Sequence, residues 1–235
     1  MSFDLPRNVI LPVDAVDVVL DPAPHPFELA HADAIDRNWQ LELQMRPAVF
    51  DGTVVLLSAF GYADRRLSGR CHAVRYATFM YWRRDRAGTA AHAFAHPVLV
   101  ASDNALVAIR MAAHTVNAGK VYFAAGSFES EDFPNGQVDL HHNMAREVLE
   151  ETGLDIGQAR RGALCHALST EKGTVIFRRY HLDMQADEIS ARIEMFVAGE
   201  SEPEIERPVI IRNAGDLPDG LMPHMKPLID WHFAV

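Results

Sequence analysis

The segment "AREVLEETGLDI", residues 145–156, places Glu147, Glu150 and Glu151 within five positions of an expected helix. Residues three and four apart are neighbours on a helix surface, so Glu147 faces both of the other glutamates. Like charges at this spacing destabilise an isolated helix. The pattern therefore predicts a cation that offsets the repulsion.

The chain on either side of this helix mixes strands and helices. Apolar runs flanking a turn at Asp103–Asn104 predict a hairpin of strands at 96–102 and 105–111. Strict alternation of strand and helix is lacking, so the sequence predicts an α+β fold with a mixed sheet. The other expected strands are 8–13, 16–20, 53–60, 120–126, 162–169, 174–184 and 207–212, and the other helices are 28–45, 186–198 and about 225–233.

A linker separates two parts of the sequence. The stretch "RDRAGTAAHAFAHP", residues 84–97, predicts a boundary between an N-terminal module, 1–94, and a second domain, 95–235. With 235 residues, 49% of them hydrophobic, the chain can bury one large core or two smaller ones.

Composition excludes several classes of partner and location. The formal net charge of −10 argues against binding to nucleic-acid backbone, and the basic cluster "YWRRDR", residues 81–86, is interpreted as a solvated strand end. The two cysteines, Cys71 and Cys165, lack metal-ligand spacing and fit a reducing compartment. No signal sequence or apolar run of about 18 residues is found. We expect a cytoplasmic protein that binds neither nucleic acid nor membrane; its oligomeric state stays open.

The carboxylates of the helix suit a hard divalent cation. Magnesium commonly takes a few carboxylate oxygens together with waters and substrate phosphates. Glu147, Glu150 and Glu151 offer such a partial set from one helical face. Bound Mg²⁺ would relieve the repulsion between them.

The segment "REVLEETGL", residues 146–154, resembles the second half of the Nudix box at every position. At average residue usage, such a match arises by chance on the order of once in ten thousand chains of this length. The alternative is an ordinary exposed helix end, with Gly153 as a left-handed cap and the glutamates solvated.

The upstream half of the box departs from the family pattern. "AAGSFES", residues 124–130, is similar to its Pro-Gly-Gly-x-x-Glu opening if Gly126 and Glu129 occupy the matching positions. An insertion of about six residues within 131–140 then separates the two halves. The upstream acidic residue stays open between Glu131, Asp132 and Asp139, the last of which could instead cap the helix.

The resemblance implies a Nudix α/β/α sandwich and an active site. Glu147, Glu150 and Glu151 would bind Mg²⁺ or Mn²⁺, and Arg146 would orient them through charge-assisted hydrogen bonds. A backbone carbonyl near Ala125 or Gly126 would complete the coordination. Glu151 or Glu147 would accept the proton of the attacking water during hydrolysis of a diphosphate. One later acidic residue is also expected, and four candidates stay open: Glu171, Glu202, Glu204 and Glu206.

More distant parts of the chain resemble the UDP-sugar diphosphatase branch of this superfamily. The stretches 34–52 and 74–82, the latter with Tyr76 and Phe79 three apart, carry the likeness. It implies cleavage of a UDP-sugar to UMP and sugar 1-phosphate. An ADP-ribose or dinucleotide diphosphatase and a non-catalytic nucleotide-sugar sensor are the alternatives.

Substrate-binding residues are not assigned by the sequence. Tyr76, Phe79, Tyr81 and Tyr122 could stack on a base, although core packing is the commoner use of such aromatic residues. The twelve histidines lack the spacing of a zinc site, and the adjacent His141 and His142 point in different directions on a helix.

Overall fold

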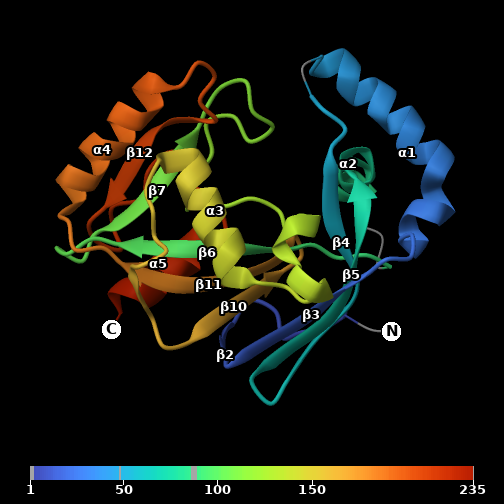
Figure 1. The fold of residues 1–235 in the computed structure, drawn as a ribbon, viewed down its shortest axis with the longest axis horizontal. Helices are drawn as coiled ribbons and strands as arrows, with labels where there is room; N and C mark the ends of the chain where they lie inside the picture. Colours follow the sequence, from blue (N-terminus) through green and yellow to red (C-terminus); the bar gives the residue numbers. More distant parts are fainter. Residues whose placement is uncertain (1–2, 48, 86–88, 235) are drawn as a thin grey trace. The chain divides into compact units, whose positions relative to one another are not determined.

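Strands and helices mix along the chain without strict alternation, as the sequence predicts (Figure 1). The computed structural model describes residues 3–47, 49–85 and 89–234. Its α+β class with mixed sheets confirms the predicted fold class. The chain forms two compact units: unit 1 comprises Met1–Phe94, Ser127–Leu140 and Ser169–Thr174, and unit 2 comprises Ala95–Gly126, His141–Leu168 and Val175–Val235.

The predicted boundary between residues 94 and 95 falls in the linker 84–97. Residues 86–88 of this linker lie outside the described residues. Two separate domains at 1–94 and 95–235 therefore stay a prediction. No helix within the described ranges is both long enough and apolar enough to cross a membrane.

Unit 1 contains a four-stranded mixed sheet in the order β1-β4-β5-β3. Strands β4 and β5 form an antiparallel hairpin, while β1 pairs with β4 and β3 with β5 in parallel. Asp64 and Arg65 turn this hairpin with positive φ values of 50° and 58°, the conformation that a two-residue type I′ loop requires. The strands of this unit are β1 (Phe3–Asp4), β2 (Ile10–Val13), β3 (Ala15–Asp21), β4 (Thr53–Ala63) and β5 (Arg66–Arg75).

Strand β5 was not predicted. Its sequence, "RLSGRCHAVR", buries Leu67, Cys71 and Val74 but exposes most of the residues between them. Polar residues are interspersed among the apolar ones along the whole strand, so a rule based on continuous apolar runs does not detect it.

The first predicted helix is confirmed as α1 (Pro26–Met45). It begins two residues earlier than expected because His25 caps it. The His25 Nδ1 atom accepts a hydrogen bond of 2.9 Å from the N–H of Phe27, and Pro26 occupies the first turn, where a missing N–H costs nothing.

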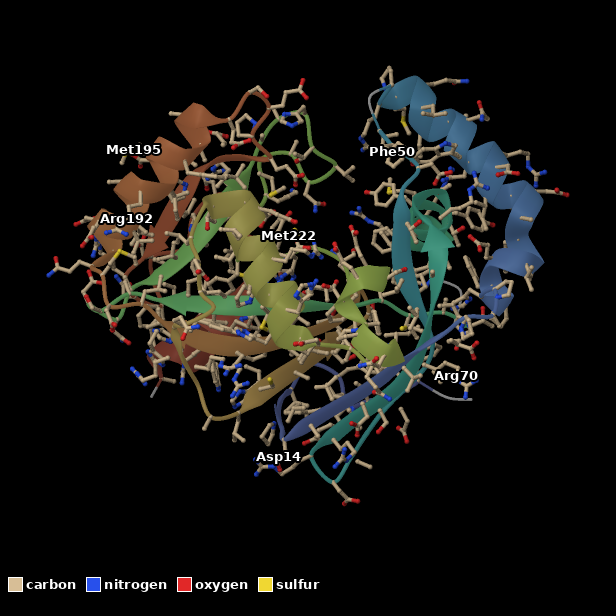
Figure 2. All side chains as sticks on the ribbon, viewed as in Figure 1. Asp14, Phe50, Arg70, Arg192, Met195 and Met222 are labelled. Carbon is tan, nitrogen blue, oxygen red and sulfur yellow. The ribbon has the colours of Figure 1, made fainter. Side chains whose placement is uncertain are left out.

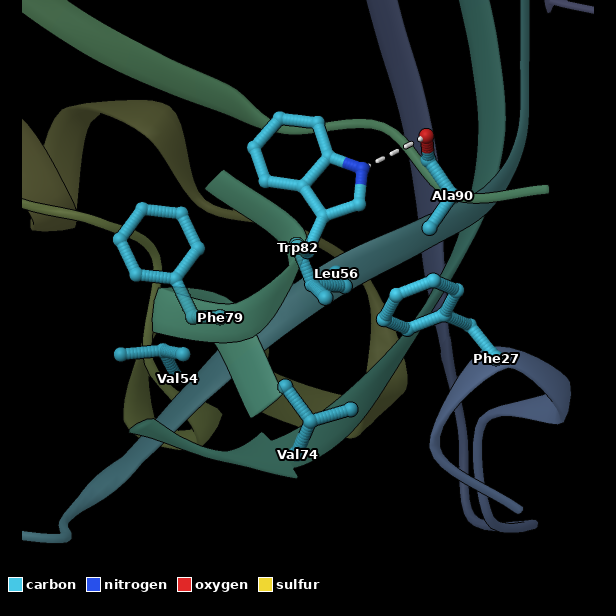
Figure 3. Close-up of a cluster of buried hydrophobic side chains, with 7 residues drawn as sticks. All are labelled: Phe27, Val54, Leu56, Val74, Phe79, Trp82 and Ala90. Atoms are coloured by element: carbon cyan, nitrogen blue, oxygen red, sulfur yellow. Dashed lines mark hydrogen bonds between the residues drawn. The ribbon is translucent and has the colours of Figure 1, made fainter. Parts of the chain in front are cut away.

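The interpretation of residues 81–86 as a strand end is wrong. Tyr81 to Asp85 belong to helix α2 (Tyr76–Asp85), and Arg86 lies outside the described residues. The helix forms because Phe79 and Trp82, three apart, turn one face into the core of unit 1, where the Trp82 indole N–H donates to the carbonyl of Ala90 at 3.1 Å (Figure 3). The core cluster consists of Phe27, Val54, Leu56, Val74, Phe79, Trp82 and Ala90, with Tyr76 and Tyr81 packed against it.

Unit 2 is built on a sheet in which β12, β7, β6, β11 and β10 are successive neighbours, with β8 on β7 and β9 on β11. The predicted hairpin is confirmed, since Leu99 pairs with Val107 across a turn in which Asn104 has a φ of 64°. The strands are β6 (Ala93–Val100), β7 (Leu106–Met111), β8 (Val121–Tyr122), β9 (Arg160–Arg161), β10 (Cys165–Thr170), β11 (Gly173–His181) and β12 (Ile205–Ile211).

Two helices of unit 2 cover opposite faces of β11. The Tyr180 hydroxyl lies 3.0 Å from Nδ1 of His141 on α3 (Leu140–Thr152), whereas the Arg179 guanidinium lies 3.7 Å from the centre of the Trp231 ring on α5 (Met225–Phe233). Adjacent residues of a strand point to opposite faces, so the layers are helix, sheet and helix. The expected α/β/α arrangement is confirmed for this unit.

Helix α4 (Ala186–Gly199) packs on β7 and β12 through an apolar stripe. Ile189 and Ile193 are fully buried on its inner side. Met195, 70% exposed, and Arg192 lie on its outer side (Figure 2). Two short 3₁₀ helices, η1 (Ser130–Asp132) and η2 (Pro134–Gly136), belong to unit 1 and complete the described helices.

Helix α3 ends at a glycine that no other residue can replace without strain. Gly153 has a φ of +69°, its N–H donates to the carbonyl of Leu149 at 2.9 Å, and a Cβ atom there would lie 2.4 Å from the Phe196 ring of α4. The glycine thus supplies both the left-handed turn and the space for α4.

We predict that Gly153→Ala lowers the free energy of unfolding by about 2–4 kcal/mol, because the left-handed backbone and the overlap with Phe196 add their costs. Urea denaturation measures this loss. Gly199→Ala is the matched control, since nothing lies within 4 Å of its added Cβ. Equal stability of the two variants would contradict the steric account.

Candidate functional site

Helix α3 separates its three glutamates by environment. Glu147 and Glu151, four residues apart, are buried with exposures of 8% and 6%, whereas Glu150 is exposed. An ordinary helix end with solvated glutamates would leave all three in water. Two buried carboxylates on one helical face are expensive, so this face has another use.

Arg146 forms ion pairs with two of these three carboxylates. Its Nη2 atom lies 2.8 Å from Oε1 of Glu147, and its Nη1 atom lies 3.0 Å from Oε2 of Glu150. The cation expected from the charge pattern is therefore partly supplied by the helix itself. This geometry fits the role that the resemblance gives Arg146, which is to orient the carboxylates.

Glu151 has no such compensation in the described parts of the chain. Its Oε2 atom is buried without a hydrogen-bond partner. Burial first, and then the charges of Glu147 and Glu204, raise the pKa of Glu151 well above its usual range, while a hydrogen bond from the Ala125 backbone opposes the shift. A buried carboxylate in this position favours a bound proton or a nearby cation.

The loop before this helix approaches it without a side chain between them. A Cβ atom on Gly126 would lie 2.4 Å from both carboxylate oxygens of Glu147. Only glycine permits this contact. The backbone at Ala125 and Gly126 thus lies against the carboxylates. Coordination of a cation by a carbonyl of this segment, which the resemblance implies, stays a prediction.

The expected strand at 120–126 is therefore shorter than predicted. Regular pairing is confined to β8, Val121–Tyr122. The physical reason is that the backbone of Ala125 hydrogen-bonds to Glu151 and Gly126 lies against Glu147, so this part of the chain follows α3 instead of the sheet.

Of the four later acidic residues, Glu204 is the one whose charge acts on Glu151. It lies just before β12 and is held by a hydrogen bond of 2.9 Å from the N–H of Ala112 to its carbonyl. Glu206 pairs with Arg207 at 3.7 Å, and Glu202 is exposed, as Glu204 is. Glu171 belongs to unit 1.

The three upstream acidic candidates lie in unit 1, where one of them, Asp132, forms a capping box on η1 with Glu129. The N–H of Glu129 donates to Oδ2 of Asp132 at 2.9 Å, and the Glu129 side chain accepts from the N–H of Asp132. Asp139 directly precedes α3 and donates its N–H to the Asp132 carbonyl at 2.7 Å. The choice between Glu131, Asp132 and Asp139 stays open.

Tyr122, for which the sequence left base stacking and core packing open, is buried, and the charges of the carboxylates act on it. Its hydroxyl accepts a hydrogen bond of 3.2 Å from the Asn117 amide. Burial first, and then the charge of Glu151, raise the pKa of Tyr122, and Glu204 and Glu147 act in the same direction. The one feature of the sequence that could have placed Tyr122 near the carboxylates was its position four residues before Gly126.

These carboxylates form a partial ligand set. Among the described residues, no three His, Cys, Asp or Glu side chains form a group that could hold a metal ion. The unpartnered Oε2 atom of Glu151 and the glycine contact at Glu147 nevertheless fit a hard divalent cation that takes its other ligands from water and substrate.

Neither protein-family models nor curated proteins match the chain. Solved structures similar to it include a MutT protein from Methanosarcina mazei Go1, with 16% identity over 60% of this chain and 91% of that chain and a TM-score of 0.39. A MutT NUDIX hydrolase from Burkholderia pseudomallei has 15% identity over 59% and 95%, with a TM-score of 0.39. A protein from Deinococcus radiodurans has 11% identity over 60% and 83%, with a TM-score of 0.45. Likeness at this level does not establish a family.

We predict that, in EDTA, Glu151→Gln has a higher Tm than the parent protein at about pH 8, and that the difference disappears near pH 5. A pKa raised in the folded state stabilises the fold at low pH, and this contribution is lost as the pH rises through the folded value. Thermal unfolding across this range measures the difference. Glu194→Gln, on the exposed side of α4, is the control, and a Tm gain independent of pH would refute the argument.

Proposed function

We propose that the protein is a divalent-cation-dependent Nudix hydrolase, which cleaves the diphosphate of a nucleoside diphosphate linked to another group. The observation that carries this proposal is the buried pair Glu147 and Glu151 against the Gly126 loop, on a helix whose sequence matches half of the Nudix box. The proposal takes 95–235 as the hydrolase domain and 1–94 as a module that precedes it.

The proposed site gives each residue a separate role. Glu147, Glu150 and Glu151 hold Mg²⁺ or Mn²⁺, which when bound neutralises phosphoryl oxygens and activates water. Arg146 orients Glu147 and Glu150 through its two ion pairs. Glu204 adds negative charge at the edge of the set.

Hydrolysis needs one proton acceptor. The water oxygen forms a bond to phosphorus, its proton passes to a carboxylate, and the bond from phosphorus to the bridging oxygen breaks. Glu151 or Glu147 takes this proton. Glu151 suits the role because it is buried and its Oε2 atom has no hydrogen-bond partner among the described residues.

A non-catalytic nucleotide-sugar sensor is the alternative outside enzymes. Binding alone does not require two buried carboxylates beside an exposed third, since each buried charge costs stability. The absence of turnover by folded protein, tested with UDP-sugars, ADP-ribose, NADH, diadenosine polyphosphates and CoA in Mg²⁺, would favour the sensor.

We predict that Glu147→Gln, Glu150→Gln and Glu151→Gln each reduce turnover at least a hundredfold while the protein stays folded. Each change removes charge that supports the cation in the transition state, and it also relieves repulsion on the helix. Steady-state kinetics and circular dichroism measure the two effects. Glu194→Gln should match the parent protein, and near-normal turnover in all three variants would remove α3 from the mechanism.

The proposed substrate is a UDP-hexose, UDP-glucose or UDP-galactose, cleaved to UMP and hexose 1-phosphate. Support comes from the resemblance of 34–52 and 74–82 to the UDP-sugar diphosphatase branch and from the insertion within 131–140. ADP-ribose and dinucleotides stay the alternatives, because the box itself does not distinguish them.

We predict a higher kcat/KM for UDP-glucose or UDP-galactose than for ADP-ribose. Preference at the transition state requires recognition of the base while the diphosphate reaches the cation. Kinetics with all three substrates and separation of the nucleotide products measure it. If ADP-ribose is preferred tenfold, about 1.4 kcal/mol, the UDP-sugar assignment fails and the hydrolase assignment stands.

A further inference from the structure

His72 on β5 is a buried histidine of unit 1 that makes a hydrogen bond through each ring nitrogen. Its Nδ1 atom lies 2.8 Å from the carbonyl oxygen of Ala23, and its Nε2 atom lies 2.8 Å from Oγ of Ser58 on β4. A carbonyl oxygen only accepts, so Nδ1 carries the proton and Nε2 presents its lone pair. The Ser58 hydroxyl therefore donates its proton to Nε2.

A β-bulge brings Ser58 to this position. The pairing of β4 with β5 shifts register between Leu57 and Ala59, so Ser58 is the extra residue. Bulges re-aim a side chain and are over-represented beside active sites. The other acceptor of the hydroxyl, the Arg70 carbonyl, lies at 3.5 Å, so the bond to His72 is the stronger of the two.

The carbonyl that orients His72 is itself held in place. The N–H of Ala23 donates to Oδ1 of Asp21 at 2.9 Å, and Oδ2 of Asp21 pairs with Nη1 of Arg70 at 2.8 Å. A carboxylate thus fixes the loop whose carbonyl accepts from the ring. These contacts maintain the tautomer in which Nε2 of His72 is the acceptor.

The two partners differ in their access to solvent. His72 is 4% exposed, so bulk water does not compete for Nε2, whereas Ser58 is partly exposed and can meet a small molecule from solution. His25, whose ring centre lies 5.0 Å from that of His72, is fully buried, and burial lowers its pKa. His25 is therefore neutral at neutral pH and does not oppose a positive charge on His72.

We propose that Ser58 is a nucleophile with His72 as its general base, and that this pair takes up an acyl group from a small activated ester or thioester. Ser58 Oγ forms a bond to the carbonyl carbon while its proton passes to Nε2 of His72. The bond from carbon to the leaving oxygen or sulfur then breaks, and the leaving group takes the proton from Nε2. Acyl-Ser58 and an alcohol or thiol are the products.

Acetylation of the full-length protein by 4-nitrophenyl acetate tests the proposal. We expect the acetyl group on Ser58, with release of 4-nitrophenol, and peptide mapping by mass spectrometry locates it. Ser68, an exposed serine on β5, is the internal control and should react about a hundredfold or more slowly, because it lacks the contribution of a general base. Cys71 does not compete, because burial raises the pKa of its thiol to about 12.

Two variants separate activation of Ser58 from its exposure. Ser58→Ala should remove the label. His72→Gln, whose amide can still form a hydrogen bond to Ser58 but cannot take up its proton, should slow acetylation of Ser58 about a hundredfold or more. Ser68→Ala is the matched control and should react at Ser58 like the parent protein, with circular dichroism to show that each variant is folded.

Equal rates at Ser58 and Ser68 in the parent protein would overturn the proposal without any variant, and so would equal rates at Ser58 in the parent and in folded His72→Gln. The pair lies in unit 1 and the glutamates of α3 lie in unit 2, so this inference does not rest on the proposed hydrolase function. A parent protein that acetylates Ser58 but cleaves no diphosphate would overturn only the hydrolase. The reverse result would overturn only the role of Ser58 and His72.

Discussion

The contact between the backbone of Gly126 and the Glu147 carboxylate constrains the rest of unit 2. With no side chain between loop and helix, α3 lies close enough for the neighbouring Ala125 backbone to bind Glu151. Strand β8 then ends at Tyr122, because the backbone that follows it contacts the glutamate side chains of α3 and does not pair in the sheet. A single missing Cβ thus couples the end of a strand to the burial of two charged groups.

The adjacent residues Glu150 and Glu151 illustrate how a helix assigns different environments to identical side chains. Glu150 faces solvent and pairs with Arg146, an arrangement that contributes little to stability. Glu151, one residue later, is buried beside two like charges and has an oxygen without a partner. Such an arrangement costs stability, and proteins keep costly arrangements of this kind where function requires them.

The sequence predicted those features that depend on local pattern. The hairpin at Asn104, the helix α1 and the three glutamates follow from turn residues and helical spacing. Strand β5 was missed because polar residues interrupt its apolar ones, and α2 was missed because "YWRRDR" was interpreted as a charge run without the preceding Phe79. These errors concern which side of an element meets the core, and only the tertiary fold decides that.

The candidate site divides in the same way. The box residues are close together in sequence, so spacing alone could identify them. Tyr122 lies on another part of the chain, and its relation to Glu151 depends on the pairing of β7 with β8 and on the loop at Gly126. The sequence left the later acidic residue open among four candidates, one of which is Glu204. The choice depends on the fold, because the approach of Glu204 to Glu151 requires β12 to lie beside β7.

Gly153, at the end of α3, and Gly126, which contacts its side chains, serve different purposes, and this difference supports the interpretation of residues 124–154 as a Nudix-like pattern. Gly153 is required by a positive φ and by the Phe196 ring, so any protein with this helix and this neighbour would need it. Gly126 has no such backbone requirement, since its φ is not positive, and the atoms it accommodates are the Glu147 carboxylate oxygens. Gly153 therefore supports the fold, while Gly126 allows the backbone to approach the buried Glu147 carboxylate. A chance match to a sequence pattern would not explain why the second position is also glycine.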